Sequence, residues 1–306
     1  MYCLLLAARD GAAPASPRLF DIKCYLRGVM MAFFTAEPGP DGELLLPLPE
    51  ARASWGDGAQ LRGMATSGAL ARAAEQAAGT GLLRPARWTV DLLRPAGFVP
   101  SVARAEVVRR GRRLCLVEAT LWQGETLVGK ASGLFLAAGS PATGTVWAPA
   151  GGLMAPPPGL LPATDEPRVF HSEGVGWTGS PEPHQNSSRK TLWVFPQEIV
   201  RGERPTPFQH AATAADLVNL VTNWGEAGLE FVNADLTLTL GRVPADDLEL
   251  GLTADHRVEH DGVAVTTATV FDRQGPLGTV SGTALLAPAP VDPRQVGAPA
   301  SLPVVP

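Results

Sequence analysis

The sequence is poor in cysteine and has no long apolar run. Its three cysteines, Cys3, Cys24 and Cys115, are odd in number and lack the spacing of a metal site. This usage predicts a reducing compartment without a disulfide framework, so we expect a cytoplasmic protein. No run reaches the roughly 18 apolar residues of a membrane-spanning helix, which predicts that the chain does not span a membrane.

Positive charge is also scarce. Only 18% of the residues are charged, and the formal net charge is -5. Because a protein that binds nucleic acid needs a basic face, this balance argues against a nucleic-acid partner.

Motifs for metal binding and for a serine nucleophile are missing as well. No Gly-x-Ser-x-Gly elbow is present, and the related segment Gly278–Gly282 falls inside an expected strand. His256 and His260 are four residues apart, but on a strand and its turn rather than on a helix, so they do not predict a zinc site. We therefore expect neither a metal nor another cofactor.

The two ends of the chain read unlike the middle. Residues 1–29 precede a second potential start at Met30 or Met31, and the short apolar run at the beginning has no basic residue before it, so it is a poor signal peptide. We expect residues 1–29 to be a non-native or disordered extension. Residues 288–306 are rich in proline and alanine and are expected to form a disordered tail.

The remaining residues predict two similar halves. With 306 residues, of which 45% are hydrophobic, the chain is long enough for two domains of about 150 residues each. In the first half a helix of mostly small residues is expected at 64–78. Strands joined by turns then follow, and this order predicts an α+β fold. These strands are expected at 87–94, 102–110, 113–122 and 126–137.

A Gly- and Pro-rich linker is expected at 139–167, and the same order of elements then returns. A helix is predicted at 211–228 from apolar residues spaced i, i+3, i+4 and i+7. Alternating apolar and polar residues after it predict a sheet with one buried face. The strands of this half are expected at 168–174, 190–200, 232–240, 247–258, 263–272 and 277–287.

The two halves also match at a fixed offset of 149 residues. Ala119-Thr120 falls on Ala268-Thr269, and Gly129 falls on Gly278. Ser132-Gly133 falls on Ser281-Gly282 at the same offset, and the two helices are expected to share it. Although chance could produce these identities alone, the repeated order of elements favours duplication of one domain. We predict domains at 30–138 and 168–287.

Several segments, in order, resemble acyl-CoA thioesterase II of the thioesterase-like superfamily. No single motif is diagnostic, but the resemblance covers about 31–287. In the first half it rests on Arg62-Gly63, Ala69–Glu75, Leu93-Arg94-Pro95, Arg110-Gly111-Arg112 and Gln123-Gly124. In the second half it rests on Ala215-Asp216, Phe231–Thr237 and Gly278–Gly282.

The resemblance implies a fold and an activity. The fold is a double hotdog, in which two antiparallel sheets each wrap a central helix and join into one continuous sheet. The activity is hydrolysis of acyl-CoA, the expected partner, to free acid and CoA in fatty acid metabolism. Because exposed sheet edges in this fold often pair, a homodimer is also suggested.

The resemblance further implies three site residues in the second half: Asp216, Asn233 and Ser281. A helix aspartate of the family matches Asp216, which would activate a water as general base. A strand hydroxyl of the family falls on Asn233, whose amide still has a donor and an acceptor for that water. A glutamine of the family falls on Ser281, whose side chain is shorter. Since the offset partner of Asp216 is Ser67, one site per chain is expected.

Other interpretations remain open. Asp216 could simply stabilise the N-terminus of its helix. Because Ser281 replaces the family glutamine, the protein could be a catalytically weak or inactive acyl-CoA-binding protein, and another hotdog reaction such as acyl hydration is a third option. Two further groups could contact the water or CoA, or could be ordinary solvated residues. They are Asn219 with Asn223, and the hairpin arginines Arg109, Arg110, Arg112 and Arg113.

Overall fold

The computed structural model describes residues 31–295, except for 41, 54–58, 80, 82, 142, 148–151 and 246–247. The expected extension at 1–29 lies outside the described residues, as do positions 296–306 of the expected tail. Within the described part of the chain, no helix combines the length and the apolar character needed to cross a membrane.

The first half follows the predicted order of a helix and then four strands. Two further strands, β1 (Ala32–Gly39) and β2 (Gly42–Pro47), precede it and were not predicted. They form a small sheet with β10 (Glu198–Val200) of the second half. The predicted elements are α2 (Gly63–Ala78), β3 (Leu83–Asp91), β4 (Val102–Arg110), β5 (Leu114–Gln123) and β6 (Thr126–Ala137).

The helix of the second half differs from the one predicted at 211–228. It begins earlier, at Pro207, because Thr206 caps it and forms a capping box with Gln209. It is divided into α3 (Pro207–Ala214), a 3-10 turn η3 (Ala215–Leu217) and α4 (Val218–Asn223). It ends before 228 because β11 (Trp224–Gly225) forms a hairpin with β12 (Gly228–Leu240).

The strands of the second half lie close to their predicted ranges. The segment expected at 190–200 is interrupted and forms β9 (Lys190–Val194) and β10. The others are β7 (Arg168–Ser172), β8 (Gly176–Thr178), β12 (Gly228–Leu240), β13 (Leu250–His260), β14 (Val263–Asp272) and β15 (Gly275–Val291). Because β15 continues to Val291 and a 3-10 turn follows at Pro293–Gln295, the expected tail boundary at 288 is wrong.

The offset of 149 residues holds for strands but not for helices. β5 and β14 match at both ends at this offset, and β3 and β12 match where they end, at Asp91 and Leu240. The helical segment starting at Pro207, however, lies 144 residues after Gly63. Most of the difference is taken up in β12, which has 13 residues against nine in β3 and two irregularities in its pairing. The expectation that the helices share the offset, which paired Asp216 with Ser67, is therefore wrong.

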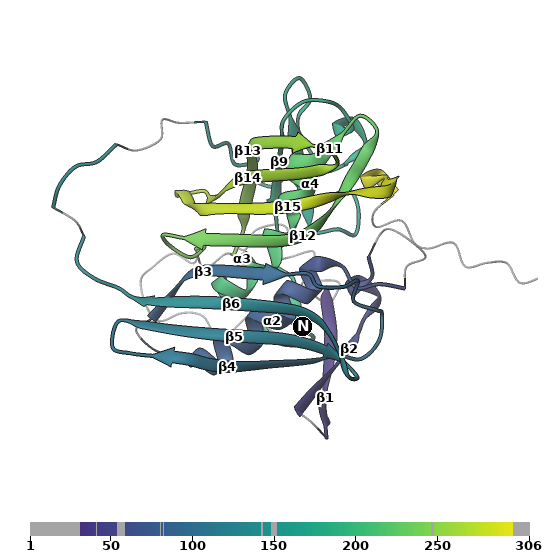
Figure 1. Ribbon diagram of the computed structural model, residues 1–306. Coiled ribbons are helices and arrows are strands. Elements are labelled where there is room, and N and C mark those ends of the chain that lie inside the picture. Colours follow the sequence, from purple (N-terminus) through teal and green to yellow (C-terminus); the bar gives the residue numbers. More distant parts are fainter. Residues whose placement is uncertain are drawn as a thin grey trace, which may run out of the picture.

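One large antiparallel sheet joins the two halves (Figure 1). Its order is β4-β5-β6-β3-β12-β15-β14-β13-β9-β7-β8, and β3 pairs with β12 at the junction. The hydroxyls of Thr89 and Thr237 lie 3.1 Å apart across this pair. The predicted continuous sheet is thus present. α2 contacts β4, β5 and β6, whereas α4 contacts β12, β13, β14 and β15.

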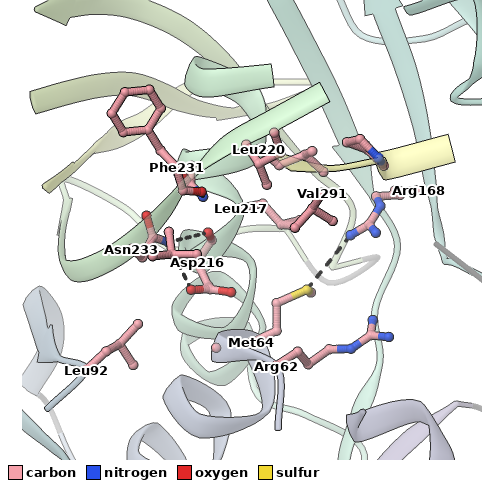
Figure 2. A pocket seen from close by; sticks show the side chains of 15 residues that line it. Arg62, Met64, Leu92, Arg168, Asp216, Leu217, Leu220, Phe231, Asn233 and Val291 are labelled. Carbon is pink, nitrogen blue, oxygen red and sulfur yellow. Dashed lines mark hydrogen bonds between the residues drawn. The ribbon is translucent and has the colours of Figure 1, made fainter. Parts of the chain in front are cut away.

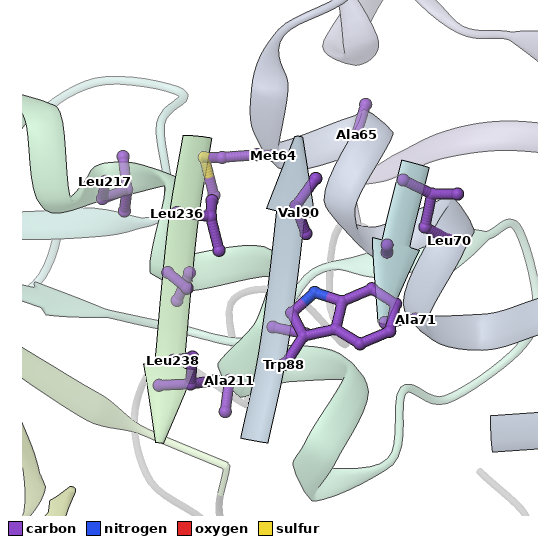
Figure 3. Packing of buried hydrophobic residues seen from close by; sticks show 14 of the residues in the cluster. Met64, Ala65, Leu70, Ala71, Trp88, Val90, Ala211, Leu217, Leu236 and Leu238 are labelled. Atoms are coloured by element: carbon purple, nitrogen blue, oxygen red, sulfur yellow. The ribbon is translucent and has the colours of Figure 1, made fainter. Parts of the chain in front are cut away.

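The two helical segments pack closely against each other and the sheet (Figure 3). At Gly68 an added Cβ would lie only 2.7 Å from the Thr213 hydroxyl, so a small residue is needed there. The Ser67 hydroxyl donates to the Ala212 carbonyl at 2.7 Å and accepts from the indole of the fully buried Trp88 at 3.1 Å. This packing sets the first turn of α2 beside η3, where the cavity described below lies.

The second part of the expected linker is packed rather than loose. Leu153, Ala155 and Leu160 pack against a small cluster of buried aromatic residues that includes Trp193 and Phe271. Its end delivers Glu166 to the protein interior, where 3% of that residue is exposed. These apolar contacts explain why a Pro-rich composition did not give a free linker here.

Acid should weaken this fold through His210. The residue is 2% exposed, and burial lowers its pKa to about 4. Between about pH 6.5 and 4 the unfolded chain binds a proton at this position that the folded protein excludes. The free energy of unfolding therefore decreases by on the order of 3 kcal/mol as the pH is lowered through this range. Denaturant unfolding between pH 7 and 4 measures it. His210→Gln should make the profile shallower, although the buried His184, whose pKa burial also lowers to about 4, still contributes to it. Substitution of the exposed His260 should not change the profile, and a profile unaffected by His210→Gln would contradict this assignment.

Candidate active site

A cavity of about 150 Å³ opens between the two halves (Figure 2). Its walls come from the first turn of α2, from η3 and α4, from the beginning of β12 and from the end of β15. Arg168 of β7 closes another side. Among the residues lining the cavity, the polar ones are Arg62, Arg168, Asp216, Asn219 and Asn233, and the apolar ones include Met64, Leu217, Leu220, Phe231 and Val291.

Asp216 lies at the centre of the helical segment, in η3, and its carboxylate faces the first turn of α2. The Met64 backbone N–H donates to the carboxylate, and Gly63 lies so close to it that a Cβ could not fit. Burial raises the pKa of Asp216, and hydrogen bonds from Asn233 and Met64 only partly offset this. The start of its own helix is capped by Thr206 instead. The Asp216 carboxylate therefore caps α2 of the other half and not its own helix.

Asn233 meets Asp216 as the resemblance implied. Its Nδ2 donates to Asp216 Oδ1 at 3.1 Å and to the Asp216 carbonyl at 3.0 Å. The inward-facing residues of β12 are Leu236 and Leu238, so simple alternation would turn Asn233 outward. A β-bulge between Asn233 and Asp235 shifts the alternation by one residue and turns Asn233 inward.

Ser281 does not join this pair. It lies across from Thr237 on β12, and its neighbours Val280 and Gly282 are the buried residues of this stretch. A Cβ on Gly282 would lie 3.9 Å from Asn233 Oδ1, so the strand position that faces the site is Gly282. Because successive strand side chains point to opposite faces, Ser281 points away from the cavity. The expectation that Ser281 shares the site with Asp216 is wrong.

Replacing Ser281 should therefore leave unchanged the acyl-CoA hydrolysis that the resemblance implies. We expect Ser281→Ala to keep kcat/KM within about twofold, since its hydroxyl does not reach the cavity and surface changes have small effects. Steady-state assays with one acyl-CoA measure this. A loss of tenfold or more would show that Ser281 contributes to the site after all.

Three charged residues of the site were not found from the sequence. Arg62 Nη1 and Glu166 lie 2.9 Å apart, and Arg168 Nη2 lies 3.2 Å from the same carboxylate. Burial alone would raise the pKa of Glu166, but the two arginines hold it below its usual value. Arg62 belongs to a segment of the family resemblance, whereas nothing in the local sequence marked Glu166 and Arg168.

The other candidate groups have structural partners. Asn219 donates to the Phe231 carbonyl at 2.7 Å and accepts from Asn223 at 2.8 Å, so this pair joins α4 to β12. Arg110 Nη2 donates to the carbonyls of Ala77 and Ala78, which end α2. Arg110 thus caps a helix C-terminus, a role that cations commonly take.

The cavity brings together two groups that ester or thioester hydrolysis can use, a carboxylate and an amide beside it. Asp216 can accept a proton from water, and Asn233 Oδ1 can orient that water because its Nδ2 is already bonded to the carboxylate. Among the described residues there is no group of three or more histidine, cysteine, aspartate or glutamate side chains that could hold a metal ion.

Two family models match the chain. The acyl-CoA thioesterase N-terminal domain matches residues 51–136, and the acyl-CoA thioesterase C-terminal domain matches residues 139–286. The second match contains Asp216, Asn233 and Ser281. No curated protein matches the chain.

Solved structures of hotdog proteins share the fold. The tesB protein of Mycobacterium avium subsp. paratuberculosis is 16% identical with a TM-score of 0.56, covering 80% of this chain and 93% of its own. Acyl-CoA thioesterase II TesB2 of Mycobacterium marinum is 18% identical with a TM-score of 0.53, covering 73% and 90%. A conserved hotdog protein of unknown function from Alicyclobacillus acidocaldarius is 18% identical with a TM-score of 0.55, covering 81% and 94%.

Proposed function

The chain belongs to the acyl-CoA thioesterase family, and from this premise we propose that it hydrolyses acyl-CoA to free acid and CoA by an Asp216-activated water. The observation that carries the proposal is the Asp216 carboxylate, which opens on the cavity and is held by Asn233 Nδ2 at 3.1 Å. A carboxylate with a raised pKa is a better base for water than an exposed one.

In this mechanism water attacks the thioester carbonyl carbon while Asp216 takes one of its protons. The carbonyl π electrons move to the oxygen and form a tetrahedral oxyanion. When this intermediate collapses, the C–S bond breaks and the thiolate of CoA receives the proton from Asp216. Since a thiol has a pKa of about 8.5, the thiolate leaves readily without strong prior protonation. Asn233 positions Asp216 and the water and does not itself exchange a proton.

The proposal includes the finer architecture and setting. Each half of the large sheet would curl around its own helix as one hotdog, so that the chain is a double hotdog. Its first domain would span 30–138, and its second would begin at 168 and include β15 to Val291. The contacts of α2 with β4–β6 and of α4 with β12–β15 support this arrangement. A cytoplasmic location, a place in fatty acid metabolism and a homodimer belong to the same proposal.

A second function is favoured by one observation. The strand position that faces Asn233 is Gly282, which offers no side chain to hold a water. With only Asp216 and Asn233 to bind the water, the protein could bind acyl-CoA without turnover. Water would then still enter the cavity but would not be held in line with the carbonyl carbon.

One experiment separates the two functions. The purified protein is mixed with saturated acyl-CoAs of two to sixteen carbons and a thiol reagent, and binding of a non-hydrolysable acyl-CoA thioether is measured in parallel. Release of CoA thiol supports hydrolysis, and its rate should rise with pH as Asp216 ionises above its ordinary pKa. Thioether binding without thiol release supports the second function, and neither binding nor release contradicts both.

A further inference from the structure

The two arginines of the cavity are unequally satisfied. Arg62 donates from Nη1 to Glu166 and from Nε to the Arg52 carbonyl at 3.1 Å. Arg168, only 5% exposed, shares the same Glu166, and its Nη1 has just the Met64 sulfur at 4.0 Å. In the described part of the chain its Nε has no hydrogen-bond partner. Since a thioether is a weak acceptor, Arg168 keeps two poorly used donors at a buried position.

The charges around the cavity balance before the reaction. Arg62 and Arg168 carry two positive charges, and Glu166 and ionised Asp216 carry two negative ones. When Asp216 takes a proton from water, its negative charge disappears and an equal charge appears on the substrate oxygen. A cation or an aligned donor near that oxygen would stabilise the new charge.

The nearest helix N-terminus is already engaged. The first turn of α2 lines the cavity, but the Met64 N–H donates to Asp216. Arg62 uses Nη1 for Glu166 and Nε for the Arg52 carbonyl. Two of the three guanidinium nitrogens of Arg62 thus have oxygen partners, whereas Arg168 has an oxygen partner at Nη2 alone. Figure 2 shows Arg168 on a different wall of the cavity from Asp216, with Met64 between them.

We propose that Arg168 stabilises the oxyanion of the tetrahedral intermediate. This inference rests on the proposed hydrolysis of acyl-CoA. As water attacks, the carbonyl electron pair moves onto oxygen, and Arg168 donates hydrogen bonds to that oxygen. When the carbonyl reforms, the C–S bond breaks and the sulfur takes the proton from Asp216. No metal and no second co-reactant takes part, and Arg168 keeps its own protons throughout.

The test compares Arg168→Met and Arg168→Lys with the wild type. Loss of an oxyanion donor typically lowers kcat by about 10² to 10³, so we expect a loss of this size in Arg168→Met with KM nearly unchanged. Arg168→Lys keeps the charge but not the paired donors and should fall between. The positive charge of Arg168 also lowers the pKa of Asp216. In Arg168→Met, which lacks this charge, the acid limb of the kcat/KM profile should therefore move to higher pH.

A matched control is Arg72→Met. Arg72 is also buried, at 7% exposure, and pairs with Glu43 and Glu203, but it does not line the cavity. The Arg72→Met variant should be less stable than the wild type and should keep its kcat. If Arg168→Met does not fold, the double variant Glu166→Gln with Arg168→Met removes the pair of opposite charges together and should show the same loss of kcat.

Two results would overturn the inference. One is a kcat within threefold of wild type in Arg168→Met or in the double variant. The other is a loss confined to acyl chains that carry a carboxylate, measured as succinyl-CoA against butyryl-CoA, because Arg168 would then bind a substrate charge. An inactive wild type contradicts the proposed function instead, so the two failures are distinguishable.

Discussion

Asp216→Asn is expected to lower kcat about 10³-fold, within the 10² to 10⁴ range that a positioned general base contributes. The amide has nearly the same shape and can still accept the hydrogen bonds of Asn233 Nδ2 and the Met64 N–H, but it cannot take a proton from water. The change should therefore separate catalysis from binding. Affinity for the acyl-CoA thioether should stay within a fewfold of wild type while thiol release falls.

The matched control for this variant is Asp235→Asn. Asp235 lies on the same strand as Asn233 and accepts hydrogen bonds from the backbone and hydroxyl of Thr283, but it does not line the cavity. The same chemical change should leave kcat near wild type. Equal losses of kcat in both variants would mean that removal of either acid disturbs the sheet. That result would contradict the assignment of Asp216 as the general base.

Glu166→Gln should produce the largest loss of stability, about 3 to 5 kcal/mol, because it leaves the buried Arg168 and the half-buried Arg62 without their shared counter-ion. Glu166 is 3% exposed, so water cannot replace the missing charge. Urea unfolding followed by tryptophan fluorescence measures the change. Adding Arg168→Met to this variant should recover part of the loss, since the unpaired charge is then removed.

Glu203→Gln gives the comparison at a similar ion pair. Arg72 contacts both Glu203 and Glu43, and the Glu203 side chain is 49% exposed. Removing one of two solvated partners should cost less than about 1 kcal/mol. The contrary result is that Glu166→Gln lowers the free energy of unfolding by no more than Glu203→Gln does. In that case the pairing of Glu166 with two arginines would not be the contact that anchors the end of the linker beside the cavity.

Much of the fold could be read from the sequence because it depends on local patterns. Strand-like segments bounded by turn residues placed β4, β5, β6 and β14 within a residue or two, and the stretch of small residues placed α2. The strand repeat at 149 residues followed from the same patterns. The helix of the second half was less accurate, since its start depends on the Thr206 capping box and its end on a short hairpin.

The positions of the predicted site residues depended on features that no local pattern encodes. Asp216 and Asn233 were named from the resemblance, and they meet because a bulge turns Asn233 inward. Ser281 was misplaced because strand alternation fixes the face of a residue only when the register is known. In the structure Gly282 takes the inward position, so the residue next to the expected one faces the cavity.

The sequence by itself determined most strands of the large sheet, the order of a helix and then strands in each half, and the family. It could do so because hydrophobic period, turn residues and ordered short segments are properties of neighbouring residues. Only the tertiary structure decided which charges meet. Arg62, Glu166 and Arg168 are separated by up to about a hundred residues of chain, and they converge because the end of the linker docks beside the first turn of α2. Burial then gives their charges a strength that the same residues would not have in water.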